Sequence, residues 1–260
     1  MARIGWGDEC IVTGQVRELY DRDPRRVRIV YERPRWHAAF DYNPKIASPG
    51  EEGNLQDLRP RVHGLRPYCT SKTPERWTWK AYRPPRGELF FNKDEERFRN
   101  ENLGRVIFEA GLKINASPNK DWGWSNWGAL NGMAERAGIK VTQLGEARPQ
   151  MLHGAEYLQT RTMRIAAAVI AGAKVVVTHE GATHHVAAAF GVPTIVLFGG
   201  YISPAVTGYD DQVNLFSGGD LGCGARTTCS HCRKAMNAIA PELVFEKLNG
   251  LLNGNLRRVP

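Results

Sequence analysis

Short apolar runs alternate with alanine-rich segments through the second half of the chain, and this alternation limits the folds that the sequence can adopt. Strand-like runs occupy residues 105–111, 139–145, 174–180 and 193–199. Helical patterns occupy residues 122–137, 160–173 and 182–190. Strands that are apolar along their whole length and alternate with helices are typical of a parallel sheet covered on both faces. We therefore predict a doubly wound α/β domain.

The first half of the chain begins in a similar way. A short strand is expected at residues 2–6, a turn and helix at 7–20, and a second strand at 26–31. A βαβ start at each end predicts two Rossmann-like domains that face a cleft. The sequence between residues 31 and 85 is Pro-rich and weakly periodic, so we expect a reduced N-terminal domain. The predicted domains are residues 1–103 and 104–260.

The composition narrows the possible binding partners and the cellular location of the protein. The chain has 260 residues, 42% of them hydrophobic, and a formal net charge of +8. A basic protein favours an acidic partner, such as nucleic acid, a phosphorylated glycan or an anionic membrane surface, although the charge is spread and fits a solvated surface equally well. No apolar run approaches the roughly 20 residues that cross a bilayer, and the start lacks the pattern of a signal peptide. We expect a cytoplasmic protein with no transmembrane segment.

The segment HEGATHH, residues 179–185, follows a predicted strand and leads into a predicted helix. Ligands of open parallel sheets bind at the carboxyl ends of the strands. Gly181 and Ala182 allow backbone N–H groups to approach a ligand, and the helix presents its positive end. His184 or His185 can add a donor, so a phosphate or diphosphate is the predicted ligand. The alternative is that Gly181 only turns the chain and an imidazole packs in the core.

The stretch EGATHHVAAAFGVPTIVLFGG, residues 180–200, resembles the donor-binding segment of the family 9 glycosyltransferases, the heptosyltransferase-like enzymes with a GT-B fold. The matching positions are Glu180, Gly181 to Thr183, His185, and Gly191 to Gly199. The resemblance extends to Lys120 and Trp122 after an earlier strand, and to Gly7-Asp8 near the start of the chain. The sequence departs from the family at Glu180, where many members have Asp, and in its short first domain.

This resemblance implies an inverting, metal-independent transfer of a sugar from a nucleotide diphosphate sugar to a hydroxyl, with no further cofactor. Such a transfer needs a base for the acceptor hydroxyl and positive charge for the departing diphosphate. Asp8 is the expected catalytic base; alternatively it caps the first helix. The expected donor-binding residues are Lys120, Glu146, Glu180, Gly181, Ala182, Thr183 and His185. Lys120 could instead be solvated. His185 is expected to neutralise the leaving diphosphate, whereas His184 is expected to be structural.

Three other functions remain open at this stage. The acceptor could be a modified nucleic acid with a hydroxylated base rather than a glycan of the lipopolysaccharide type. The chain could be a non-catalytic module that binds a nucleotide sugar. It could also be a sugar-nucleotide epimerase. Arg residues interleaved with aromatics at 33–42 and 66–88 could form the acceptor surface, or a loop held down by its aromatic side chains.

Three cysteines, Cys223, Cys229 and Cys232, cluster near the C-terminus with His231 between them. Thiolates and an imidazole at such spacing can build a tetrahedral zinc site. Adjacent His231 and Cys232 are poorly placed to bind one ion together, so we expect packed or redox-sensitive thiols and no catalytic metal. The Asp21-Arg22-Asp23 sequence lies before Pro24 at a predicted helix end and is interpreted as surface rather than as a metal-binding Asp-x-Asp.

Overall fold

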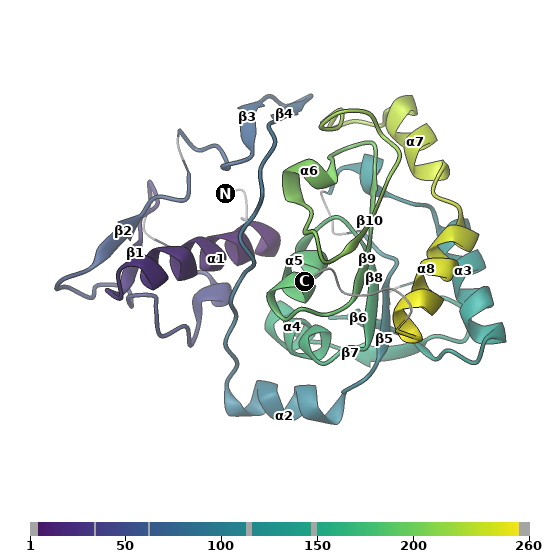
Figure 1. Cartoon of the computed structure of the whole chain (residues 1–260), viewed down its shortest axis with the longest axis horizontal. Coiled ribbons are helices and arrows are strands. Elements are labelled where there is room, and N and C mark those ends of the chain that lie inside the picture. The colour runs from purple at the N-terminus through teal and green to yellow at the C-terminus, as the bar shows by residue number, and fades with distance from the viewer. Residues whose placement is uncertain (1–4, 34, 62, 113–115, 147–149, 255–260) are drawn as a thin grey trace.

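The computed structural model describes residues 5–33, 35–61, 63–112, 116–146 and 150–254. Its centre is a six-stranded parallel sheet with the strand order β10-β9-β8-β5-β6-β7 (Figure 1). The strands are β5 (Val106–Glu109), β6 (Val141–Gly145), β7 (Glu156–Gln159), β8 (Val175–His179), β9 (Thr194–Gly199) and β10 (Val213–Phe216). The parallel sheet predicted from the second half of the chain is therefore present. The short edge strands β7 and β10 were not predicted.

Helices cover both faces of this sheet (Figure 1). They are α3 (Trp124–Arg136), α4 (Met163–Ala171), α5 (Ala182–Ala189), α6 (Pro204–Thr207), α7 (Ser230–Asn237) and α8 (Pro241–Leu252). Val175 and Val177 of β8 join a buried cluster with α3 and α8, whereas Val176 joins one with α4 and α5. Because successive side chains of a strand point to opposite faces, both faces need apolar residues, which explains the continuous apolar runs.

The first part of the chain is smaller and less regular. Its elements are α1 (Trp6–Arg22), β1 (Val27–Ile29), the 3₁₀ turn η1 (Ala38–Phe40), β2 (Gln56–Leu58), β3 (Cys69–Lys72), β4 (Trp77–Trp79) and α2 (Lys93–Glu101). Strands β1 and β2 form a parallel pair, and β3 and β4 an antiparallel pair. The strand expected at residues 2–6 falls mostly outside the described residues, but Trp6 already belongs to α1, so the helix begins earlier than predicted.

The N-terminal part shares its apolar core with the sheet. Cys10 and Val16 of α1 belong to the same buried cluster as Val186 and Ala187 of α5. A hydrogen bond also joins the two parts, since Arg164 of α4 donates to the carbonyl of Ala38 at 2.7 Å. Its guanidinium also pairs with the buried carboxylate of Glu95 in α2 at 2.6 Å. The first strand of the sheet begins at Val106, close to the predicted domain boundary near residue 104. The boundary itself stays a prediction, because one continuous core joins the two parts of the chain.

Helix α1 lies unusually close to α5, at Gly7. A Cβ atom built on Gly7 would lie 2.6 Å from Cδ2 of His185, closer than such atoms approach one another. Any other residue here would force the buried His185 ring, or one of the two helices, to shift. This close approach brings Asp8, the next residue, beside the first turn of α5.

No helix of the described residues is long and apolar enough to span a membrane.

Candidate functional site

The candidate site lies where the connections of the sheet diverge. The chain runs from β5 outward through β6 to β7, and then returns to β8 on the other side of β5 before continuing to β9 and β10. In open parallel sheets ligands bind at the carboxyl ends of the strands at this switch point. Lys120 follows β5, in the 3₁₀ turn η2 (Pro118–Lys120), and Glu180 follows β8 directly. The structure thus places two predicted donor-binding residues at the switch point.

Lys120 and Glu180 form a largely buried ion pair. The Lys120 ammonium contacts Oε2 of Glu180 and lies 3.3 Å from the Glu180 backbone carbonyl. The Thr207 hydroxyl donates to Oε1 of Glu180 at 3.2 Å. Burial alone would raise the pKa of Glu180, but the charge of Lys120 and these hydrogen bonds outweigh it, so its pKa lies below the ordinary value. Glu180 is therefore a carboxylate that holds the Lys120 ammonium at the carboxyl edge of the sheet.

The first turn of α5 faces this ion pair. Gly181 is the N-cap of α5, and Ala182 and Thr183 are its first two residues. The first N–H groups of a helix have no partner within the helix and carry its partial positive charge, so they can receive an anion. A Cβ atom on Gly181 would meet nothing within 4 Å, and its φ of 166° is ordinary extended backbone. The open space therefore suits a ligand, although the backbone conformation there does not require glycine.

His184 belongs to the fold. Its Nδ1 accepts the Gly181 N–H at 2.9 Å, and its Nε2 lies 3.0 Å from the Thr207 carbonyl, to which it donates. The side chain is fully buried, and burial lowers its pKa below the ordinary value of histidine. A neutral imidazole with both nitrogens engaged positions the start of α5, and the structural role expected for His184 agrees with these contacts.

His185 differs from the expectation. Its ring lies against Gly7 of α1, and its Nδ1 is 2.8 Å from the Tyr209 hydroxyl. Burial, followed by the neighbouring His184, Lys120 and Arg66, lowers the pKa of His185 well below its ordinary value. The imidazole is therefore neutral at pH 7, and the positive charge that the sequence analysis assigned to it must come from other residues.

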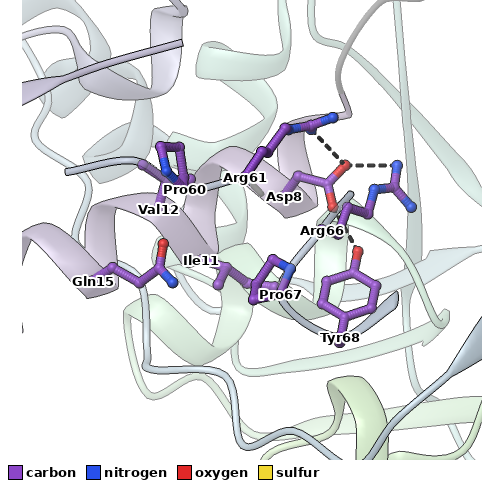
Figure 2. Close-up of a pocket in the computed structure, with 9 residues that line it drawn as sticks. All are labelled: Asp8, Ile11, Val12, Gln15, Pro60, Arg61, Arg66, Pro67 and Tyr68. Carbon is purple, nitrogen blue, oxygen red and sulfur yellow. Dashed lines mark hydrogen bonds and ion pairs between the residues drawn. The ribbon is translucent and has the colours of Figure 1, made fainter. Parts of the chain in front are cut away.

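Asp8 lies in the first turn of α1, as its third residue, and not at the N-cap, which is Gly5. Figure 2 shows its carboxylate among three donors from the segment that follows β2. The Tyr68 hydroxyl donates to Oδ1 at 2.5 Å, and guanidinium groups of Arg66 and Arg61 lie 2.7 and 3.9 Å from Oδ2. These residues line a small pocket beside α1. Because α1 packs against α5, Asp8 lies on the same side of the molecule as α5.

Arg66 was expected only as part of the possible acceptor surface at residues 66–88, and not as a partner of Asp8. Burial lowers its pKa, but Tyr68, Asp8, Glu180 and Tyr201 together raise it above the ordinary value. Arg66 therefore lies in the electrostatic field of acidic groups from both parts of the chain. It also stacks on the Trp77 ring, 4.5 Å from the centroid. Its signal in the sequence was weak, because it lies in a Pro-rich stretch without periodicity.

Glu146 lies apart from this group. It follows β6, is exposed, and its backbone carbonyl accepts from the Gln159 side chain at 3.2 Å. Since β6 is parallel to β5 and β8, Glu146 shares their carboxyl edge, but no described contact joins it to Lys120 or Glu180. The structure therefore places Glu146 at the correct edge of the sheet without bringing it into the cluster.

Two groups of side chains within the described residues are close enough to hold a metal ion. One consists of Glu180, His184 and His185. It fits a metal poorly, because both nitrogens of His184 are engaged and the Lys120 ammonium lies on the Glu180 carboxylate. The other is the cysteine cluster with His231, considered below.

Comparison with known proteins identifies the relatives of this chain. Residues 105–242 match the family model described as glycosyltransferase family 9 (heptosyltransferase). No curated protein matches the sequence. Among solved structures, a family 9 glycosyl transferase from Veillonella parvula is similar with a TM-score of 0.67 and 15% identity, over 96% of this chain and 95% of that one.

Two further structures are similar over a smaller share of their own length. The iron-containing dodecameric glycosyltransferase TibC from enterotoxigenic E. coli has a TM-score of 0.63 and 13% identity, over 98% of this chain and 75% of that one. The ADP-heptose lipopolysaccharide heptosyltransferase II of E. coli has a TM-score of 0.48 and 20% identity, over 70% of this chain. This chain spans only 56% of the length of that protein. At these identities the similarities to Veillonella parvula and TibC establish the fold.

Proposed function

Because this chain belongs to glycosyltransferase family 9, we propose that it transfers a sugar from a nucleotide diphosphate sugar to a hydroxyl of a glycan acceptor. Family membership confirms the resemblance seen in the sequence, and the α/β fold of GT-B type is confirmed by the similar structures. The observation that carries the proposal is the Lys120–Glu180 ion pair at the switch point, beside the first turn of α5.

The donor diphosphate is proposed to bind between the first turn of α5 and the side chains of Lys120 and Arg66. The N–H groups of Ala182 and Thr183 would donate to phosphate oxygens, as helix N-termini do for anions. Glu180 would orient the Lys120 side chain toward the ligand. Glu146 is the weakest member of the proposed donor set, because its place at the same sheet edge is its only support.

Positive charge at this position replaces what a divalent cation does in other sugar transferases. Negative charge develops on the diphosphate as the bond from the anomeric carbon to the leaving oxygen breaks. Fixed cations in a partly buried site stabilise that charge without a metal ion. We therefore propose a metal-independent transfer, in which Lys120 and Arg66 supply the charge that had been expected of His185, with no cofactor in the chemical step.

Asp8 is proposed to accept the proton of the attacking hydroxyl. The acceptor oxygen forms its bond to the anomeric carbon from the face opposite the departing diphosphate, which inverts the configuration, and its proton passes to the carboxylate. Asp8 suits this role because its side chain is nine-tenths buried next to the pocket, beside two guanidinium groups. Tyr68 and Arg66 fix the direction of the carboxylate.

The acceptor is proposed to be a glycan, because the family description names heptosyltransferases. Its binding surface would be the segment 66–88, whose Arg66 and Tyr68 already line the Asp8 pocket. A nucleic-acid acceptor, which the basic charge also suits, has no support from the similar proteins.

A turnover assay tests the proposal. Release of nucleoside diphosphate is measured from a panel of ADP-, UDP-, GDP- and dTDP-sugars, with a lipopolysaccharide core glycan, with hydroxylated DNA, or with no acceptor. Release that requires the glycan supports the proposed function. Conversion of the donor to an epimer without acceptor would instead indicate an epimerase, and binding without any turnover would indicate a non-catalytic module.

A further inference from the structure

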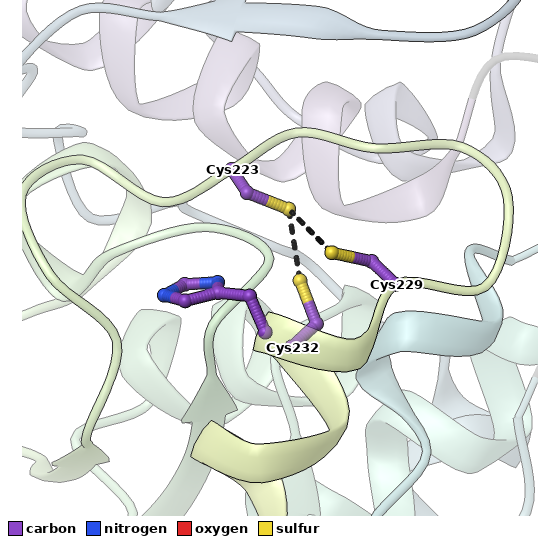
Figure 3. A group of neighbouring side chains, drawn as sticks. Cys223, Cys229 and Cys232 are labelled. Atoms are coloured by element: carbon purple, nitrogen blue, oxygen red, sulfur yellow. Dashed lines mark hydrogen bonds between the residues drawn. The ribbon is translucent and has the colours of Figure 1, made fainter.

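Figure 3 shows three cysteines clustered at the start of α7, and His231 belongs to the same group. The Sγ atom of Cys223 lies 2.8 Å from that of Cys232 and 3.9 Å from that of Cys229. A nitrogen of His231 completes the group, in which all four ligand atoms lie within 4.8 Å of one another. All three cysteines are free thiols. The structure therefore gathers the four side chains around one point, although two of them are adjacent in sequence.

We propose that Cys223, Cys229, Cys232 and His231 bind one tetrahedral metal ion with a structural role, and that the ion is zinc or another metal that prefers thiolates. Three thiolates and one imidazole form a complete donor set for structural zinc. Tetrahedral bonds of about 2.3 Å separate two sulfur atoms by about 3.8 Å, close to the distance between Cys223 and Cys229. The pair Cys223 and Cys232 needs to open by about 1 Å, which a small rotation of either side chain achieves.

The surroundings of the cluster suit bound thiolates. The backbone N–H of Ala225 donates to the sulfur of Cys223 at 3.4 Å, as outer-shell donors do around metal-bound sulfur. Cys229 is the N-cap of α7 and Cys232 lies in its first turn, where the helix dipole favours negative charge. Arg226, between Cys223 and Cys229, and Arg233, directly after Cys232, add positive charge to the same segment of the chain.

The loop that carries these cysteines braces two parts of the candidate site. Gly224 has a φ of 64°, and a Cβ atom there would lie 1.8 Å from the Trp77 carbonyl oxygen, so the loop lies directly on β4. On its other side, Asn119 donates to the carbonyls of Ala225 and Thr227, each at 2.8 Å, and accepts from the Cys229 N–H at 2.9 Å.

Asn119 directly precedes Lys120 in η2. A metal ion at the cysteines would therefore fix the loop that holds both the β3–β4 hairpin and the turn that presents Lys120. This consequence depends on the proposed donor site, whereas the metal site itself does not.

Metal content of the purified full-length chain tests the proposal directly. Protein produced with zinc and iron in the medium and purified without chelator is analysed for metals, and its melting temperature is measured before and after a strong chelator. One metal ion per chain is expected. Its removal should lower the melting temperature by several degrees, and added Zn²⁺ should restore it.

Variants show whether these residues hold the ion. Cys229→Ser should lose the metal, and exposed His231→Ala should bind it more weakly, while Cys69→Ser and His153→Ala, outside the cluster, should keep it. Titration of metal-free protein with Co²⁺ provides a second measurement, because thiolate-bound tetrahedral cobalt absorbs strongly.

Protein that contains no metal, takes up neither Zn²⁺ nor Co²⁺, and melts unchanged with chelator would overturn the proposal. A disulfide between two of the three cysteines, found by mass spectrometry of protein purified under reducing conditions, would overturn it as well. Neither result depends on whether the chain transfers a sugar.

Discussion

The Lys120 ammonium rests on the carboxylate of Glu180, although the two residues lie 60 positions apart in the sequence. Parallel pairing of β5 with β8 brings them together, since each residue follows the carboxyl end of its strand. Glu180 is buried, and its pKa is held below the ordinary value, so it stays a carboxylate in a partly dry environment. A partly exposed cation held in place by one carboxylate can receive an anionic ligand.

Replacement of Asp8 by Asn should abolish most of the turnover and leave donor binding in place. The amide keeps the size of the side chain but cannot accept the proton of the acceptor hydroxyl, and general-base catalysis is typically worth about 10²- to 10⁴-fold in rate. Steady-state kinetics should show this loss in kcat. Asp21→Asn in the last turns of the same helix is the control and should leave kcat unchanged. Equal turnover of Asp8→Asn and the parent would remove Asp8 from the chemical step.

Replacement of Gly7 by Ala should destabilise the fold, although helix propensity alone would make alanine the more stable residue. Alanine in a helix is normally more stable than glycine by about 1 kcal/mol. At Gly7, however, the added Cβ would lie 2.6 Å from the His185 ring and push α1 away from α5. Denaturant titration measures the free energy of unfolding. Gly128→Ala in α3, where a Cβ meets nothing within 4 Å, should be stabilising. A stabilising effect at both positions would contradict the close contact of the two helices.

Buried neutral histidines should make the protein less stable in mild acid. His179 accepts the Trp122 N–H at 3.2 Å, and burial lowers its pKa from the ordinary 6.5 to about 4. The unfolded chain therefore binds a proton that the folded chain excludes. The stability contributed by His179 is complete above pH 6.5 and falls as the pH drops toward 4, by at most about 1.4 kcal/mol per pH unit.

Urea titrations at pH 7.5 and 5 measure this loss. His179→Gln should lose less stability than the parent between the two pH values, whereas the exposed control His153→Gln should lose as much as the parent. Identical pH dependence in all three proteins would show that His179 is not held neutral by the fold.

The sequence predicted the parts of the molecule in which local pattern and tertiary position agree. Apolar runs and alanine-rich segments predicted β5, β6, β8 and β9 with the helices between them, since strands buried on both faces need apolar residues at every position. The edge strands β7 and β10 were not predicted, because their half-exposed residues do not form a continuous apolar run.

Only part of the geometry of the candidate site could be foreseen from the sequence. Lys120 and Glu180 follow predicted strands, so their meeting could be foreseen. The role of His185 depends on where α1 packs, and Arg66 is held in place by Asp8, which is distant in sequence, and by the Trp77 ring. Contacts of this kind come from tertiary structure and leave no periodic signal in a single sequence. His231 was visible among the cysteines in the sequence, but its place within 4.8 Å of their sulfur atoms depends on the first turn of α7.

The most direct test of the donor site is a calorimetric titration of nucleoside diphosphates into the parent, Lys120→Ala and Lys174→Ala. Lys174 is exposed and precedes β8, so it lies at the opposite edge of the sheet and serves as the matched control. A hydrogen bond to a charged group is worth about 1.5 to 3 kcal/mol, so Lys120→Ala should weaken binding by roughly 10- to 150-fold while Lys174→Ala binds as the parent does. Equal affinities of all three proteins, or no binding of any nucleoside diphosphate by the parent, would contradict a diphosphate site at Lys120 and Glu180.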